Sequence, residues 1–273
     1  MPSNIGSSTP IQPLSLGNTV SAGLRLYRSH LKDYFLLALK AYLWLLVPIY
    51  GWAKFYALIS LISRLAFGEL VNQPESISSG QRHVNSKLWQ FLVTMLLMFL
   101  IGIGIIFGFS LLFGLFFGVL VGTGFQQNYI TYLLVGFISI AAFVAFLWFG
   151  ARFYLVDLPL AIENNVNSVS TISRSWELTQ GHVWRILLII FVASLITLPI
   201  QIIVQILKNI LDVIFAPFLH QVFSIFPLVF YVGILFCSSA VILPFWQSIK
   251  AVIYYDLRSR REGLGLKLRD RDV

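Results

Sequence analysis

Polar side chains recur along one otherwise apolar stretch of the chain. They are spaced 4, 3 and 4 residues apart, so a helix would place them on one face: Gln201, Gln205, Lys208 and Asp212. Such a face could line a hydrophilic path through a membrane. The alternative is a helix that extends into the outer interface of the bilayer, where Lys208 and Asp212 would pair as residues i and i+4.

Basic residues form a second set with binding chemistry. Lys40 lies within the apolar segment 36–43, where a cation either contacts an anionic group or extends its side chain to the lipid headgroups. Lys54, Arg152 and Lys250 stand at the edges of apolar stretches. These residues either form a basic ring that contacts anionic lipid headgroups, or mark cytoplasmic helix ends under the positive-inside rule.

The residue types that catalysis or metal binding needs are not assembled in the sequence. Cys237 is the single cysteine, and the four histidines form no paired metal-binding motif. The sequence also contains no phosphate-binding loop and no nucleophile–base motif. We therefore expect no cofactor, no metal and a protein that is not an enzyme.

Composition predicts the kind of element that positions these side chains. The chain has 273 residues, of which 58% are hydrophobic and 11% charged, and its mean hydropathy is +0.84. A soluble protein carries about 25% charged residues, so this composition excludes a soluble domain and predicts an all-α, polytopic helical membrane protein. The net charge of +8 then belongs to cytoplasmic loops and does not indicate nucleic-acid binding.

The distribution of charge predicts two transmembrane hairpins. The 64 residues between Lys87 and Arg152 contain no Asp, Glu, Lys, Arg or His, and the 64 between Arg185 and Lys250 contain only Lys208, Asp212 and His220 of these types. One span needs about 20 apolar residues, so each stretch holds two spans. We expect the turns near 118–128 and at Ala216–Pro217, ending by Gln221.

The third span is expected to kink or stop at Asp157–Pro159, because proline removes a backbone donor. Arg152 is expected to pair with a carboxylate there, either Asp157 or Glu163.

The first apolar segment, about residues 34–67, leaves two alternatives. It makes a fifth crossing, or it forms a re-entrant hairpin broken at Pro48–Gly51 that returns to its own side. The hairpin is favoured because the preceding residues are basic.

Boundaries follow from these segments. We expect a flexible polar N-terminus over 1–17, a single membrane domain over 18–261 and a basic cytoplasmic tail over 262–273. The predicted apolar segments are 34–67, 88–118, 129–158, 184–214 and 222–256. The excess of basic residues at the hairpin ends places the C-terminus in the cytoplasm and suggests a bacterial inner membrane or its equivalent.

Regular spacing of basic residues predicts an internal repeat. Lys54, Arg152 and Lys250 are each 98 residues apart, as are Lys87 and Arg185. The repeat unit would be a basic anchor, a polar arm, a second anchor and a hairpin.

The polar arms are predicted to be amphipathic helices on or near the cytoplasmic face. In the arm 168–184, Val169, Ile172 and Trp176 share one face, and Gly181 is a natural stop. The apolar face either lies in the lipid interface or packs on the bundle. If the arm recognises a partner, its candidate residues are Arg174, Ser175, Trp176, Glu177 and Trp184.

The arm also carries a recognisable pattern, Ser175-Trp176-x-Leu178-x-x-Gly181-x-x-Trp184. It resembles the S-W-x-L-x-x-G-x-x-W arm of bacterial proteins grouped with the glycerophosphoryl diester phosphodiesterase membrane domain, over about residues 140–260. The resemblance implies a helical membrane bundle with repeated interfacial arms. It implies no phosphodiesterase activity, because the chain has no room for that family's separate catalytic barrel.

Glycines concentrate between Ile101 and Gly124, with the pairs Gly104/Gly108 and Gly114/Gly118 at i, i+4. Small residues at this spacing let helices approach closely, either within the bundle or across a homo-oligomer seam. The whole pattern predicts a non-enzymatic membrane scaffold or assembly protein that contacts the lipid bilayer and a membrane-protein partner. The alternative is a transporter or lipid-handling protein that uses the interface between repeats.

Overall fold

The computed structural model describes residues 14–122, 129–219 and 225–263, and every regular element in these ranges is an α-helix. The all-α prediction is therefore confirmed. In chain order the helices are α1 (Leu16–Ser29), α2 (Leu31–Trp44), α3 (Tyr50–Leu70), α4 (Ile77–Ser86), α5 (Leu88–Gly122), α6 (Tyr129–Phe153), α7 (Asp157–Ile162), α8 (Ser170–Thr179), α9 (Val183–Leu219) and α10 (Ile225–Glu262).

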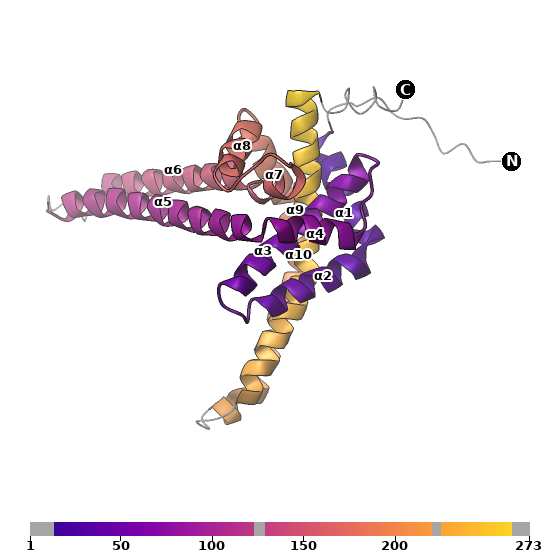
Figure 1. Ribbon diagram of the computed structural model, residues 1–273. Coiled ribbons are helices and arrows are strands. Elements are labelled where there is room, and N and C mark those ends of the chain that lie inside the picture. The colour runs from indigo at the N-terminus through magenta and orange to yellow at the C-terminus, as the bar shows by residue number, and fades with distance from the viewer. Residues whose placement is uncertain (1–13, 123–128, 220–224, 264–273) are drawn as a thin grey trace.

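Four segments are long and apolar enough to cross a membrane, so the chain is a helical membrane protein. They are Leu88–Leu120, Tyr129–Ile162, Val183–Ile214 and Val229–Glu262. Figure 1 shows α5 and α6 leaving the rest of the molecule in one direction, whereas α10 leaves it in another. Helix α9 packs along α10. Helix α5 packs on α3 and α6 packs on α9, but α5 and α6 do not pack closely on each other.

The core lies at one end of the long helices. We call this part the platform, residues 14–94, 148–197 and 240–262; the rest of the four long helices, residues 95–122, 129–147, 198–219 and 225–239, are the distal segments. Helix α3 is central to the platform and packs against α2, α4, α5, α7 and α10. Its Leu58, Leu61 and Ile62 are fully buried, as are Ile249 and Tyr254 of α10.

Helix α1 packs on the bundle. Its N-terminus is capped by Ser15, whose hydroxyl accepts a hydrogen bond from the Asn18 amide at 3.2 Å. A Cβ on Gly23 would lie 2.4 Å from Cδ1 of Ile249, and Tyr27 donates to the Val241 carbonyl at 3.0 Å. The side of α1 that carries Gly23 and Tyr27 therefore faces α10.

The first apolar segment is a helical hairpin. Helix α2 ends at Trp44 and α3 begins at Tyr50, and the two helices pack together. The break falls where the re-entrant alternative expects it, at Pro48–Gly51; whether the segment crosses a membrane stays a prediction.

Two other predicted helix ends are confirmed and two are corrected. Helix α6 ends at Phe153 and the short α7 contains Pro159, as the proline predicts. After α8, Gly181 has a positive φ of 77° and ends the arm. Helix α9, however, continues through Ala216–Pro217 to Leu219. Helix α5 likewise continues through the expected turn residues 118–122, to Gly122. The remaining expected turn residues 123–128 and 220–221, the N-terminus before residue 14 and most of the basic tail lie outside the described residues.

Candidate functional site

The predicted recognition arm forms α8 and packs firmly on the platform. Asn167 begins it by accepting hydrogen bonds from the amides of Val169 and Ser170 at 3.1 and 2.9 Å. Ser175 was expected on the exposed polar face, but it is buried and its hydroxyl donates to the Arg152 carbonyl at 2.9 Å. This correction reflects a helix–helix contact with α6 that periodicity within one arm cannot reveal.

Arg174 connects three elements. Its guanidinium contacts Glu163, in the segment between α7 and α8, at 3.3 Å and also pairs with Glu262 at the end of α10. Burial alone would lower the pKa of Arg174, but the two carboxylates raise it above its usual value. The side chain is therefore a charged clamp between α8 and α10.

Glu163 is the centre of this clamp. The Tyr254 hydroxyl donates to its Oε1 at 2.5 Å, and Arg258 lies 3.9 Å from the same oxygen. The Glu163 carbonyl also accepts from Nζ of Lys87 at 2.6 Å. Sequence reasoning noticed Glu163 only as a partner for Arg152; its position just beyond a proline-containing helix was the available signal.

Trp176 packs against a buried cation. Its ring centroid lies 3.9 Å from the Arg152 guanidinium carbon and 5.5 Å from the Trp148 centroid. Arg152 is only 4% exposed, and its Nη1 donates to Thr179 at 3.4 Å. The expected pairing of Arg152 with Asp157 or Glu163 is wrong, because both carboxylates are engaged by other cations.

Two of the predicted recognition residues are exposed. Glu177 is exposed, and Trp184, at the start of α9, is 62% exposed. These two side chains are the members of the predicted recognition set that remain available at the surface.

The other basic anchors have different partners. Lys250 pairs with the buried Asp157 at 3.0 Å, and Lys54 donates to Asn85 at 2.9 Å. Each also stands over an aromatic ring, Tyr154 at 5.2 Å and Tyr50 at 5.6 Å respectively. Lys250 is therefore neutralised within the chain, whereas Lys54 has no ion-pair partner among the described residues. Lys40 lies exposed on α2. The predicted basic ring stays a prediction.

Two further cations close the C-terminal end of α7. Lys87 donates to the Leu160 carbonyl at 3.2 Å, and Arg64 donates to the Ala161 carbonyl at 2.6 Å. Cations are favourable at this end of a helix because its last carbonyls have no partner within the helix. Burial lowers the pKa of Lys87, and nearby Arg64 lowers it further, while Glu163 opposes them.

The predicted polar path does not line a hydrophilic cavity among the described residues. Gln201, Gln205, Lys208 and Asp212 are all exposed on distal α9. Gln201 donates to Thr197 at 3.2 Å and Gln205 to Asn209 at 3.0 Å, so each amide bonds along its own helix. Among the described side chains, no ion pair joins Lys208 to Asp212. Lys208 instead borders an apolar cavity of about 170 Å³ against α10.

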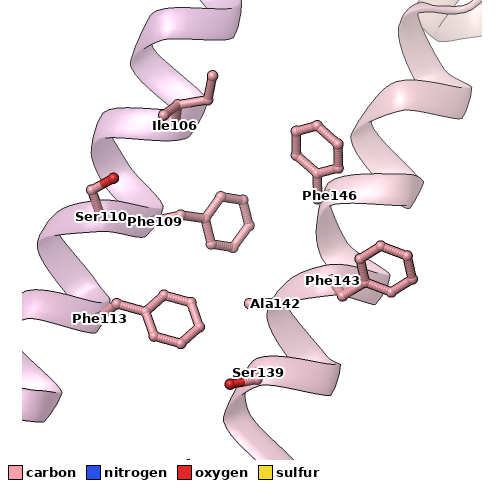
Figure 2. Close-up of a pocket in the computed structure, with 8 residues that line it drawn as sticks. All are labelled: Ile106, Phe109, Ser110, Phe113, Ser139, Ala142, Phe143 and Phe146. Atoms are coloured by element: carbon pink, nitrogen blue, oxygen red, sulfur yellow. The ribbon is translucent and has the colours of Figure 1, made fainter. Parts of the chain in front are cut away.

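An open apolar groove separates α5 from α6. It measures about 460 Å³ and is lined from both helices by Ile106, Phe109, Ser110, Phe113, Ser139, Ala142, Phe143 and Phe146. Figure 2 shows Phe109 and Phe113 projecting from α5 toward Ala142 on α6. A Cβ added to Gly104, Gly108, Gly114 or Gly118 would meet nothing within 4 Å. The expected close packing at these glycines is therefore absent within the described chain.

Within the described ranges, no group of three or more His, Cys, Asp and Glu side chains could hold a metal ion. The chain matches no family model, no curated protein and no solved structure.

Proposed function

We propose that the chain is a non-enzymatic membrane scaffold that presents transmembrane helices to a partner protein. The platform fixes one end of two hairpins, and the distal segments offer their apolar faces to transmembrane helices of that partner.

One observation carries this proposal. In the most apolar 18-residue window of each candidate span, the share of residues buried inside the chain is 0, 6, 22 and 17% in chain order. Helices that associate in a membrane do so through side-chain packing and hydrogen bonds. Spans that find so little packing within their own chain are free to pack with another chain.

The charge distribution supports the same proposal. Ion pairs hold the platform ends of the helices, while the distal segments of α5 and α6 carry no ionisable side chain except the tyrosines Tyr129 and Tyr132. By the positive-inside rule, the platform side with Arg258, Arg260 and Arg261 is cytoplasmic. A bacterial inner membrane, the 98-residue repeat and the resemblance to the phosphodiesterase-associated membrane family belong to this proposal.

Site-specific photo-crosslinking in native membranes tests the scaffold. A photoreactive residue at Phe107 on α5 or Leu133 on α6, which are 67 and 74% exposed, should give a discrete adduct with a second protein chain. The matched control is Ser173, which is exposed on the platform and should give no such adduct. Adducts with lipid alone at both distal positions would contradict the proposal.

The groove between α5 and α6 favours one second candidate, a lipid-handling protein. Its volume of about 460 Å³ lies within the range of about 300–1,000 Å³ for ligand pockets, and its lining of phenylalanines suits an acyl chain. Replacing Ala142 by Trp should fill the groove and reduce the lipid that co-purifies, measured by native mass spectrometry. The matched control is Gly150→Trp on the same helix, outside the groove; an equal loss there would remove this candidate.

A further inference from the structure

The turn between α2 and α3 exposes an unusual concentration of large apolar side chains. Leu46 is 65% exposed and Ile49 is 58% exposed. The exposed members of this surface, which we call the α2–α3 tip, are Leu43, Leu46, Val47, Ile49, Tyr50 and Trp52. The inner face of the same hairpin is buried in the platform through Leu37, Ala38 and Ala41 of α2. The hairpin therefore packs on the platform along its length, while the apolar side chains at its tip are exposed.

The tip lies between the two directions in which the distal segments extend. In Figure 1 the dark α2–α3 turn lies toward the directions in which α5, α6 and the lower part of α10 extend, while α8 and the upper end of α10 lie on the other side. A hairpin in this position meets the same medium as the distal segments.

Helix α2, the first helix of the hairpin, is too short to cross a bilayer. Helix α2 has 14 residues, which at about 1.5 Å per residue span about 21 Å. The hydrocarbon core of a bilayer is about 30 Å thick. The turn also reverses the chain, so α3 returns to the platform and the segment ends on the side where it began.

Four backbone donors of the turn are paired within it. The amides of Leu45, Leu46 and Val47 donate to the carbonyls three residues earlier, at 3.0 to 3.3 Å. Pro48 has no N–H, and Tyr50 donates across Ile49 to the Pro48 carbonyl at 2.7 Å. This tight γ-turn gives Ile49 a φ of 59° and a ψ of −70°. Backbone in lipid has no water to bond, so donors paired within the segment are what insertion requires.

Two cations flank the tip along the chain. Lys40 lies one helical turn before Trp44 and is exposed, whereas Lys54 lies one turn after Tyr50, is half-buried and donates to Asn85. Long basic side chains near the ends of an inserted segment reach the headgroup layer and attract anionic lipids. An apolar tip with a cationic collar is complementary to one leaflet of a bilayer.

We propose that the α2–α3 tip inserts into one leaflet from the platform side, as a re-entrant wedge in contact with lipid acyl chains and without crossing the membrane. The proposal does not rest on the scaffold function, because it concerns contact with lipid and not with a partner protein.

Single-cysteine labelling tests the proposal in the full chain. In a Cys237→Ser background, Val47→Cys reports the tip and Asp33→Cys, exposed at the start of α2, is the matched control. A membrane-impermeant maleimide applied to sealed vesicles should label Asp33→Cys from the platform side. Labelling of Val47→Cys from either side should be at least about tenfold slower, because reaction requires withdrawal of the apolar tip from lipid.

A second measurement identifies what covers the tip. A bimane fluorophore on Val47→Cys, in vesicles of phosphatidylethanolamine and phosphatidylglycerol, should be quenched by lipids with a nitroxide on the acyl chain and little by aqueous iodide. Rapid maleimide labelling from the far side means a crossing segment, and rapid labelling from the platform side means a tip in water. Protection without quenching by the nitroxide lipid means that protein covers the tip. Each of these three results overturns the proposal.

Discussion

Carboxylates near the inner ends of the long helices hold the platform together. Asp157 pairs with Lys250 at 3.0 Å, and Asp256 contacts both Arg185 and Arg260, at 3.1 and 3.0 Å. Both carboxylates are nearly inaccessible to solvent, with side-chain exposures of 2 and 3%. A buried charge of this kind depends on its partner, since the loss of one ion leaves the other uncompensated.

The Asp157–Lys250 pair gives the first prediction. Asp157→Ala should lower the free energy of unfolding by about 3–5 kcal/mol, because it leaves the Lys250 ammonium, with its side chain only 17% exposed, without its carboxylate. The double variant Asp157→Leu/Lys250→Met should recover most of the loss, since it removes both charges. Thermal unfolding in detergent measures both; a double variant as unstable as Asp157→Ala would show that packing, and not charge, causes the loss.

His83 gives a prediction on pH. Burial lowers the pKa of His83 below its usual value, Arg64 and Lys87 lower it further, and Glu75 opposes them. The unfolded chain therefore binds a proton at this histidine more readily than the folded chain. The contribution of His83 to the free energy of unfolding is therefore fully present above about pH 6.5 and is lost as the pH drops below it. In His83→Gln this decline should be shallower between about pH 6.5 and 5.5, measured as unfolding midpoints against pH; an unchanged slope would contradict the assignment.

At the scale of the elements, two variants of α8 compare what ring packing and ion pairs contribute to stability. Trp176→Ala removes a ring that packs on Arg152 and Trp148 and should lower stability by about 2–4 kcal/mol. Arg174→Ala removes ion pairs that are about a quarter exposed, which are worth about 0–1 kcal/mol. Equal losses of thermal stability would show that Arg174 holds α8 as strongly as Trp176 does, and would contradict this prediction.

The α2–α3 turn gives a sharper prediction. A Cβ on Gly51 would lie 1.8 Å from the Trp44 carbonyl oxygen, so Gly51→Ala should force the hairpin apart and cost about 1–3 kcal/mol or more. Gly17→Ala in α1, where a Cβ meets nothing within 4 Å, is the matched control and should be neutral or stabilising. Similar unfolding temperatures for the two variants would contradict the described turn.

Helix positions were largely predictable from the sequence, because proline, glycine and long apolar runs act locally. The end of α6 shortly before Pro159, the stop at Gly181 and the interruption at Pro48–Gly51 all follow from backbone chemistry. The partners of charged side chains were not predictable. Arg152 stacks on Trp176 and leaves Asp157 to Lys250, and that choice depends on how α6, α8 and α10 meet.

For the molecule as a whole, the sequence could not predict whether the two hairpins pack together or diverge. An apolar residue suits lipid and a protein neighbour equally well, so hydropathy predicts the spans but not whether they pack together. In the structure, α5 and α6 diverge from α9 and α10 beyond the platform (Figure 1). The repeat likewise stays a prediction, since its three basic anchors contact different partners.

The distance between the two hairpins in a lipid bilayer tests most directly whether they diverge beyond the platform. Nitroxide labels at Phe107→Cys on α5 and Leu235→Cys on α10, in a Cys237→Ser chain diluted with unlabelled chain, report this distance by double electron–electron resonance. Neighbouring helices of a closed bundle have axes about 8–10 Å apart. Because the hairpins diverge, we expect a label separation far above that of neighbouring helices in a bundle. A narrow distribution at the short distance of a closed four-helix bundle would contradict it.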